Sequence, residues 1–517
     1  MKKLKTTLAA GISVALGITY ATTILAQQTP VVSSLPVITD DCGETSCADR
    51  REFTVEQTLD LLSDAANRQS AMRANANSES SKNERNHGKG YGIGQNDNST
   101  QVVYLNFDQS SPTFQAVVFG GVVGTFESYE YSQEERDEIQ ANIADRYEGF
   151  DVEFTQEQPT DGDFSTLNFE CQQGGCIDFT AGILFGRAQS IDIRNENRND
   201  SAFVDANLWQ VFAELDPSGG LLSNFSGIPI NDGNVDAALS QAVVNQASNT
   251  GAHELGHNLG LRHHDSFGAP GDGVTPGTGD FFPVFDGPLA ALESFDHTMA
   301  SGASVGTGFA DSTVDLRFFS ERSALKLAAN QRPLILQEQD VTGGNQKVKF
   351  RRVLAPNTID SGENAEGKLE LLEARIEGSI DIAGEVDSYR FKAKAGQFLN
   401  AEFFGFDTVP TKLAQEADFV IGALALYYVE EDGSLTLVRQ NFQNFEGFDA
   451  LLVDAPLEKD GEYVLQVLSP DLLRLNPDLF ISLDATGNGQ FRSGNYEVSM
   501  YVTNGRPGKG VPRVPGA

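Results

Sequence analysis

The stretch His253-Glu-Leu-Gly-His257-Asn-Leu-Gly260-Leu-Arg-His263 decides how this chain folds and what it can bind. The chain has 517 residues and only six histidines, yet three of them lie here. On a helix, His253 and His257 are one turn apart and face the same way. Gly260 can adopt a positive φ, which turns the chain so that His263 returns to the same point. Three neutral imidazoles leave one zinc position open, as in catalytic sites.

Glu254 follows the first of these histidines. It lies about 100° round the helix from His253, close enough to face a zinc-bound water without binding the metal. Zinc lowers the pKa of its bound water toward 7 and polarises a carbonyl. Glu254 is then the general base, which takes the proton of the water and delivers it to the leaving amine. The spacing therefore predicts peptide-bond hydrolysis without an acyl-enzyme.

Hydrophobic spacing places the motif on a long helix, residues 234–259, which Gly260 ends. A capping box at Ser132 and Glu135 opens an earlier helix, in which Ile139, Ile143 and Tyr147 recur at helical spacing. β-rich runs are found at 102–107, 114–123, 150–155, 179–185 and 202–208. Strands that alternate with a helix indicate a mixed α/β sheet, so we expect an α+β fold.

Met299 lies in a small-residue turn, residues 296–302, which can place a methionine under the metal. With the motif at 253–263, this turn makes residues 101–330 resemble the metzincin clan of zinc metalloproteases. The resemblance implies a twisted mixed sheet above the cleft, an edge strand that pairs with extended substrate, and zinc bound by His253, His257 and His263. His297 is a candidate for stabilising the oxyanion.

A different pattern follows residues 331–365, which we interpret as a linker. Short alternating strands separated by Asp-Gly and Asn-Gly turns predict an all-β sandwich of about seven or eight strands over residues 366–503. Gly384–Phe391, Asp460–Val467 and Gly494–Val498 make this part resemble the bacterial pre-peptidase C-terminal (PPC) domain, a jelly-roll-like module. We expect it to fold separately and to contribute no catalytic group. Residues 504–517 are expected to be a flexible tail.

The amino terminus has the layout of a secretory signal peptide over residues 1–26, with three lysines before an apolar run. An uncleaved membrane anchor is the alternative. Residues 27–100 are polar and predict an extension or propeptide with one helix near 54–73. We therefore expect a bacterial protein that is secreted or periplasmic, without stable membrane insertion once the signal is removed.

Two equally spaced cysteine pairs, Cys42/Cys47 and Cys171/Cys176, predict two local disulfides in an exported chain. A four-thiol metal site is the alternative. The formal net charge of −36 argues against nucleic-acid binding. Acid and amide clusters at 231–236 and 265–280 make calcium a second candidate ion. Helix capping by Asn234 and solvated loop acids explain the same residues.

Together these features predict a secreted, monomeric zinc endopeptidase that acts on protein or peptide substrates. The first alternative is an exported non-catalytic binding or adhesion protein with a structural metal site. The second is a zinc hydrolase acting on non-peptide bonds. An intact Glu254 favours the peptidase.

Overall fold

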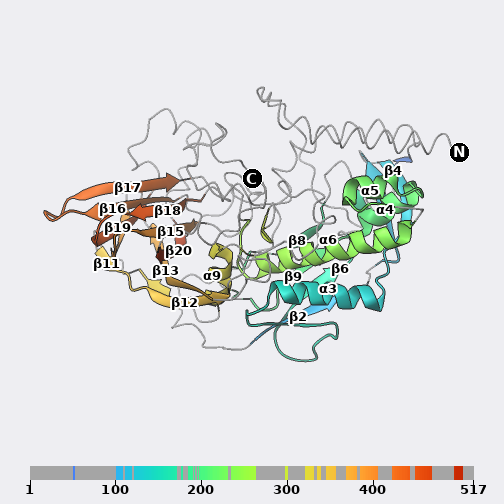
Figure 1. Ribbon diagram of the computed structural model, residues 1–517, viewed down its shortest axis with the longest axis horizontal. Helices are drawn as coiled ribbons and strands as arrows, with labels where there is room; N and C mark the ends of the chain where they lie inside the picture. Colours follow the sequence, from blue (N-terminus) through green and yellow to red (C-terminus); the bar gives the residue numbers. More distant parts are fainter. Residues whose placement is uncertain are drawn as a thin grey trace, which may run out of the picture.

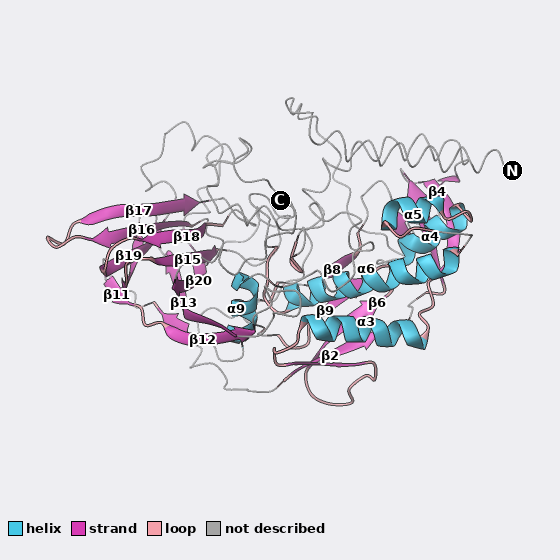
Figure 2. Cartoon of the chain, in the orientation of Figure 1, coloured by secondary structure: helices cyan, strands magenta, loops and turns pink. Residues whose placement is uncertain are grey.

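The computed structural model describes residues 51–52, 100–263 with short gaps, 297–300, 319, 321–330 and, with further gaps, 335–504. The predicted signal peptide, the helix near 54–73, the Cys42–Cys47 pair and the tail beyond residue 504 lie outside these ranges. Two structural units are visible, one mixed α/β and one composed of β-strands (Figures 1 and 2). No helix among the described residues is both long and apolar enough to span a membrane.

The first unit is built on a mixed five-stranded sheet, as the sequence predicted. Its order is β5 (Val152–Thr155), β2 (Gln101–Asn106), β6 (Phe164–Phe169), β9 (Ser201–Val204) and β8 (Gly186–Ala188). The first four strands pair in parallel, whereas β8 is antiparallel to β9 and lies at the edge of this sheet.

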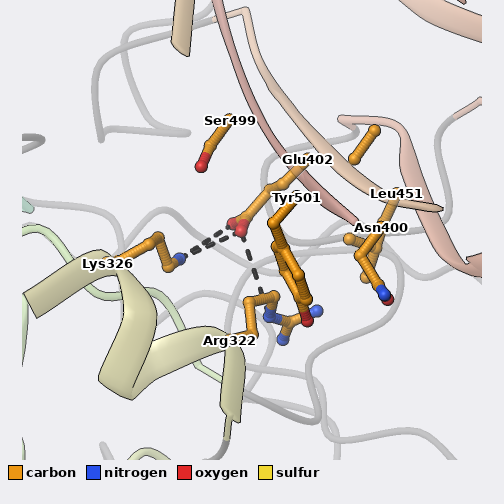
Figure 3. Close-up of a pocket in the computed structure, with 8 residues that line it drawn as sticks. Arg322, Lys326, Asn400, Glu402, Leu451, Ser499 and Tyr501 are labelled. Carbon is orange, nitrogen blue, oxygen red and sulfur yellow. Dashed lines mark hydrogen bonds and ion pairs between the residues drawn. The ribbon is translucent and has the colours of Figure 1, made fainter. Parts of the chain in front are cut away.

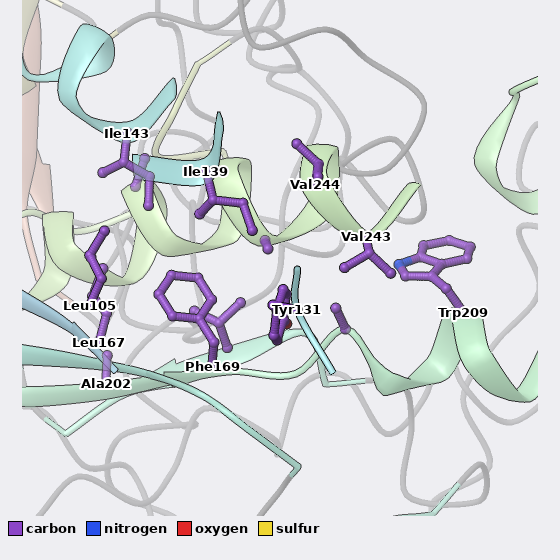
Figure 4. Close-up of a cluster of buried hydrophobic side chains, with 14 of the residues drawn as sticks. Leu105, Tyr131, Ile139, Ile143, Leu167, Phe169, Ala202, Trp209, Val243 and Val244 are labelled. Atoms are coloured by element: carbon purple, nitrogen blue, oxygen red, sulfur yellow. The ribbon is translucent and has the colours of Figure 1, made fainter. Parts of the chain in front are cut away.

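Two helices pack against this sheet, α3 (Gln133–Arg146) and α6 (Val235–Asn258). The capping box at Ser132 and Glu135 is confirmed, because each side chain accepts from the other residue's backbone N–H. Buried aliphatic and aromatic side chains fill the space between the helices and the sheet (Figure 4). The Tyr147 hydroxyl, at the end of α3, donates to the Ala252 carbonyl of α6 over 2.8 Å. This core holds α6 in a fixed position over the sheet.

A smaller sheet has the order β1 (Arg51–Glu52), β4 (Gly121–Glu127), β3 (Thr113–Val118) and β7 (Cys176–Asp178). The run expected as one strand at 114–123 is a hairpin of β3 and β4. The strand expected at 202–208 is wrong beyond Val204. There the Asp205 carboxylate accepts from the backbone and side-chain N–H groups of Asn207 and begins helix α4 (Asn207–Leu215), which α5 (Gly220–Ser226) follows.

The predicted Cys171–Cys176 disulfide is not formed in this structure. Cys171 is a buried free thiol whose Sγ lies 3.8 Å from the Ser128 hydroxyl. Burial raises the pKa of this thiol far above its ordinary value, so it stays protonated. The backbone of Cys176 instead belongs to β7, which pairs with β3. The pairing of β7 with β3 places the backbone of Cys176 in the sheet, which the equal spacing of the cysteine pairs did not predict.

The second unit is a β-sandwich, as expected for the C-terminal part. One sheet has the order β10-β13-β20-β15-β18 with β12 also on β13, and the other β11-β14-β19-β16-β17. The strands are β10 (Ile335–Gln337), β11 (Asn345–Lys347), β12 (Arg351–Pro356), β13 (Lys368–Ile380), β14 (Val386–Ala393), β15 (Gln397–Phe404), β16 (Ala423–Val429), β17 (Leu435–Phe442), β18 (Leu451–Leu457), β19 (Gly461–Leu468) and β20 (Gly494–Asn504).

The segment interpreted as a linker, residues 331–365, contains three of these strands. β10 and β12 pair with β13, and β11 pairs with β14. The polar composition of this segment suits edge strands, which are exposed along one side, so composition did not distinguish them from a linker. The sandwich therefore begins near Ile335.

Helix α9 (Glu321–Asn330) joins the two units and lies between them (Figure 1). Leu325 of α9 packs with Val353 and Tyr501 of the sandwich. Next to this contact, the Lys326 ammonium pairs with the Glu402 carboxylate of β15 at 3.0 Å, and Arg322 approaches the same carboxylate at 3.9 Å (Figure 3). The two units thus share an interface with buried charges, and separate folding of the sandwich stays a prediction.

Candidate metal centre

Three histidines gather at the C-terminal end of α6. His253, His257 and His263 are all buried, and one ligand nitrogen from each lies within 4.8 Å of the others. Their ring centroids are 4.7–5.1 Å apart. They form the only such group of His, Cys, Asp or Glu side chains within the described part of the chain. The structure therefore brings together the three residues that the sequence predicted as ligands.

The third histidine reaches this point because α6 ends in a Schellman motif. Gly260 has φ +88°, and its N–H donates to the His257 carbonyl over 2.9 Å. The N–H of Leu261 donates to the Gly256 carbonyl over 2.9 Å. This pair of bonds is the usual way a helix closes on a left-handed glycine. The positive φ predicted for Gly260 is confirmed, and it turns His263 back toward the helix.

Backbone carbonyls fix the orientation of two imidazole rings. His253 Nδ1 lies 2.8 Å from the Thr298 carbonyl, and His257 Nδ1 lies 2.7 Å from the Leu261 carbonyl. A carbonyl oxygen can only accept, so each Nδ1 carries the proton and donates it. Each Nε2 is therefore the nitrogen with the free lone pair. This is the ring orientation that metal-binding histidines normally have.

The two Nε2 atoms, one from His253 and one from His257, face each other at 3.1 Å. Two lone pairs at this distance repel unless a cation or proton lies between them. Two nitrogens 2.0–2.1 Å from one tetrahedral zinc are about 3.3 Å apart, which is close to this spacing. The donor set and the spacing therefore fit a zinc ion with three imidazole ligands.

Glu254 lies on α6 between the histidines and the edge strand β8. Its side chain is 7% exposed, and the backbone N–H of Ala188 donates to its carboxylate. A Cβ added to Gly186 would lie 2.9 Å from both Cγ and Oε1 of Glu254, so helix and strand approach too closely for a side chain there. Burial raises the pKa of Glu254 to about 7, although His263, Ala188 and Arg187 act in the opposite direction. A carboxyl with this pKa can exchange protons near neutral pH.

Met299 lies in the turn predicted at 296–302, of which residues 297–300 are described. Met299 is 1% exposed, and its Sδ occupies the space where a Cβ on Gly256 would be. The preceding residue, Thr298, supplies the carbonyl that orients His253. The turn thus contacts α6 at Gly256 and at His253, of which only His253 belongs to the cluster.

His297, the candidate for oxyanion stabilisation, is 4% exposed. Burial, together with the nearby positive charge of Arg322, lowers the pKa of His297 to about 3. The ring is therefore neutral at neutral pH. Its position beside Arg322 of α9 associates it with the interface between the two units, so no role in the reaction follows from its surroundings.

Several predicted features lie outside the described residues. They include the acidic loop 265–280, which was one calcium candidate, and residues 231–233 of the other. His264, which directly follows His263 in the sequence, is also outside the described residues. Asn234 stands at the N-cap position of α6, but its side chain makes no capping hydrogen bond. The proposed capping role of Asn234 is therefore wrong.

The residues that sequence reasoning missed act through the backbone or by close approach. The carbonyls of Leu261 and Thr298 orient ligands, and Gly186 and Gly256 admit Glu254 and Met299. A carbonyl has no residue-type signature, so only the two glycines could have been noticed. Gly256 lies within the motif itself.

Comparison with known proteins gives structural likenesses to parts of the chain. No family model matches the chain. No curated protein matches it. A periplasmic inhibitor of g-type lysozyme from Aeromonas hydrophila is 14% identical, with 33% of this chain and 96% of the inhibitor covered and a TM-score of 0.17. The pre-peptidase C-terminal domain of a Bacillus anthracis collagenase is 15% identical. The match covers 24% of this chain and 86% of that domain, with a TM-score of 0.15.

Identities and TM-scores this low do not assign the chain to a family. What the site can do must come from its own residues. Three buried histidines with converging nitrogens can hold a metal ion, and a buried carboxyl beside them can accept and donate a proton.

Proposed function

We propose that this protein is an exported zinc-dependent endopeptidase of the metzincin kind. The observation that carries the proposal is the pair of Nε2 atoms, on His253 and His257, that face each other at 3.1 Å while both Nδ1 protons are held by carbonyls. A cation between the two Nε2 atoms would relieve the repulsion of their lone pairs, as a shared proton would, and His263 offers a third nitrogen to the same ion.

A zinc ion held by these histidines would act as the Lewis acid that polarises the scissile carbonyl. Glu254 accepts the proton of the attacking water and passes it to the leaving amine. The Ala188 N–H holds the carboxylate on the side of α6 that faces β8. Burial raises the pKa of Glu254, whereas the positive charge of a bound metal would lower it, so the carboxylate can accept a proton and later return it.

The edge strand β8 gives the site a place for an extended peptide. In its sheet β8 pairs only with β9 within the described part of the chain, so backbone groups on its other side face away from the sheet, and one of them, the Ala188 N–H, donates to Glu254. A substrate strand added there would run past Glu254, which contacts β8 at Gly186 and Ala188. We therefore favour unfolded or extended protein segments as substrates.

Export is part of the proposal and rests on residues 1–26, which have the signal-peptide layout. The sandwich would then act as a PPC-type accessory domain. The alternative, a non-catalytic exported binding protein, would use the histidines as a structural metal site. Structural zinc sites normally have four protein ligands, whereas the cluster within the described residues supplies three, with a carboxyl beside them.

The test compares the mature protein with its Glu254→Gln variant. Both should bind about one zinc per chain, because the three ligands remain. Hydrolysis of casein should fall by about 10²–10⁴-fold in Glu254→Gln, because the proton acceptor is lost. Exposed Glu134 provides a matched control, and Glu134→Gln should keep full activity.

The test is completed by measuring the metal content of three further variants. We expect zinc to be lost in each of them: His253→Ala, His257→Ala and His263→Ala. The assays are run with and without residues 27–100, since that segment is a candidate propeptide. Equal activity of Glu254→Gln and wild type would contradict the proposed mechanism. Zinc loss in His264→Ala but not in His263→Ala would contradict the ligand assignment.

A further inference from the structure

Arg262 lies between two residues of the metal centre and points away from it into the second unit. Its neighbours in sequence are Leu261, whose carbonyl orients His257, and His263. The Arg262 side chain is 5% exposed, and its Nη1 lies 2.6 Å from Oδ2 of Asp449. Its guanidinium carbon lies 4.4 Å from the centre of the Phe404 ring. Both partners belong to the sandwich.

Asp449 is itself held in place by the sandwich. It is 1% exposed, and its Oδ1 accepts from the Gly405 backbone N–H at 3.0 Å. A buried guanidinium and a buried carboxylate each lose several kcal/mol of hydration, so each depends on the other. Asp449 therefore helps to fix the position of Arg262, together with the Phe404 ring.

This position matters for the ligands because the chain between them is short. Only Leu259–Arg262 separate the end of α6 from His263, and the Schellman motif closes the turn. A shift of Arg262 would move both of its neighbours in sequence. One is Leu261, whose carbonyl orients the His257 ring, and the other is His263 itself. His257 and His263 would then no longer converge with His253 on one point.

We propose that the β-sandwich completes the metal centre, with Asp449 as a positioning residue that acts through Arg262 on His257 and His263. The inference rests on the proposed function, because it takes the three histidines as zinc ligands. It assigns the C-terminal unit a role in holding the metal, beyond that of a separate accessory domain.

The experiment measures zinc affinity by competition with a chelator in the full mature chain and in Asp449→Asn. The substituted amide keeps the size of the side chain and can still accept from Gly405, but it removes the negative charge. Partners behind metal ligands typically change metal affinity by about 10–100-fold, and we expect a loss near the lower end, about 10-fold. The visible spectrum of the cobalt(II)-loaded protein should also change, because that spectrum reports ligand geometry.

Arg351→Gln is the matched control. Arg351 lies at the same interface, where it pairs with Glu373 at 2.6 Å and donates to the Ala329 carbonyl of α9 at 3.2 Å, but it is not adjacent to a ligand. This control should lower the thermal stability while zinc affinity and the cobalt spectrum stay as in wild type. An equal loss of zinc affinity in Arg351→Gln would show general loosening of the interface and overturn the proposal.

Arg262→Gln alone keeps the test decisive if Asp449→Asn folds poorly, and it should lower zinc affinity by a similar factor. The double variant then tests the route through Arg262. If Asp449 acts through Arg262, then Asp449→Asn should cause no additional loss of zinc affinity in an Arg262→Gln background. Unchanged affinity and spectrum in Asp449→Asn, with wild type binding zinc, would overturn this inference alone. A wild-type protein that binds no zinc would overturn the proposed function as well.

Discussion

Three glycines surround the histidine cluster, and two of them are required because another group occupies the space of a side chain. At Gly256 that group is the Met299 sulfur. At Gly186 a Cβ would lie 2.5 Å from Thr250 Cγ2 and 2.9 Å from the Glu254 carboxylate. Real Cβ atoms do not approach this closely, so a methyl group at either site must displace its neighbour. The contact at Gly256 explains why glycine occurs there, where a helix would favour alanine.

The Gly186→Ala variant tests whether the close approach of β8 to α6 positions Glu254. We expect a stability loss of about 1–3 kcal/mol from overpacking. We also expect a lower rate of peptide hydrolysis with unchanged zinc content, because Glu254 is displaced while the histidines are not. Denaturant unfolding, metal analysis and peptide kinetics measure the three quantities.

Adding Thr250→Ser separates the two contacts of that methyl group. Serine removes Cγ2 but keeps the hydroxyl that accepts from Gln246. The double variant should recover part of the stability and little of the activity, since the contact with Glu254 remains. Full recovery of activity would show that Gly186 does not act on Glu254.

At the scale of elements, the end of α6 decides where the third histidine lies. The helix presents His253 and His257 through its own periodicity, but it can reach His263 only by ending at the correct residue. Gly260 at φ +88° provides that ending, and bonds from Gly260 and Leu261 back to α6 stabilise it. A residue with a Cβ is strained at this φ.

Gly260→Ala should therefore cost about 1–2 kcal/mol of stability and should also weaken zinc binding. Gly396 in the sandwich is the matched control, because its φ is +87° and a Cβ there would meet no atom within 4 Å. Gly396→Ala should cost a similar amount of stability and leave zinc affinity unchanged. Chemical denaturation and chelator competition on both variants check this. Equal zinc affinity in the two would argue against the proposed role of the turn.

At the scale of the whole molecule, buried charges join the two units. Burial alone would raise the pKa of the Glu402 carboxyl, but the charges of Lys326, Arg322 and Arg262 outweigh burial and hold this pKa below its ordinary value of 4.5. These cations come from the first unit and from α9, whereas Glu402 comes from β15. The carboxylate thus stabilises the assembled protein only while it is ionised.

The stability of the Glu402→Gln variant at different pH values tests whether the ionised Glu402 carboxylate stabilises the protein. Because the folded-state pKa of Glu402 is lowered, its stabilisation is present above the unfolded-state pKa and is lost as the pH falls through the folded-state pKa. We expect Glu402→Gln to lower the free energy of unfolding by about 3 kcal/mol at pH 7. The difference from wild type should shrink as the pH falls below about 4.

Urea unfolding at several pH values measures this difference. Glu458→Gln, at an exposed position of the same unit, should show no such dependence. A difference between Glu402→Gln and wild type that is constant from pH 7 to pH 3 would contradict the assigned role of the charge.

The sequence by itself determined the features that depend on neighbours along the chain. The span of α6, the capping box of α3, the turn at Gly260 and the grouping of His253, His257 and His263 all follow from helical periodicity and local backbone bonds. Only the tertiary structure decided which distant groups meet them. It placed Thr298 behind His253, Ala188 beside Glu254 and Asp449 against Arg262, and it left Cys171 as a free thiol. These contacts join residues far apart in sequence, and they form only where strand pairing and packing of the two units bring the chain together, which no local pattern specifies.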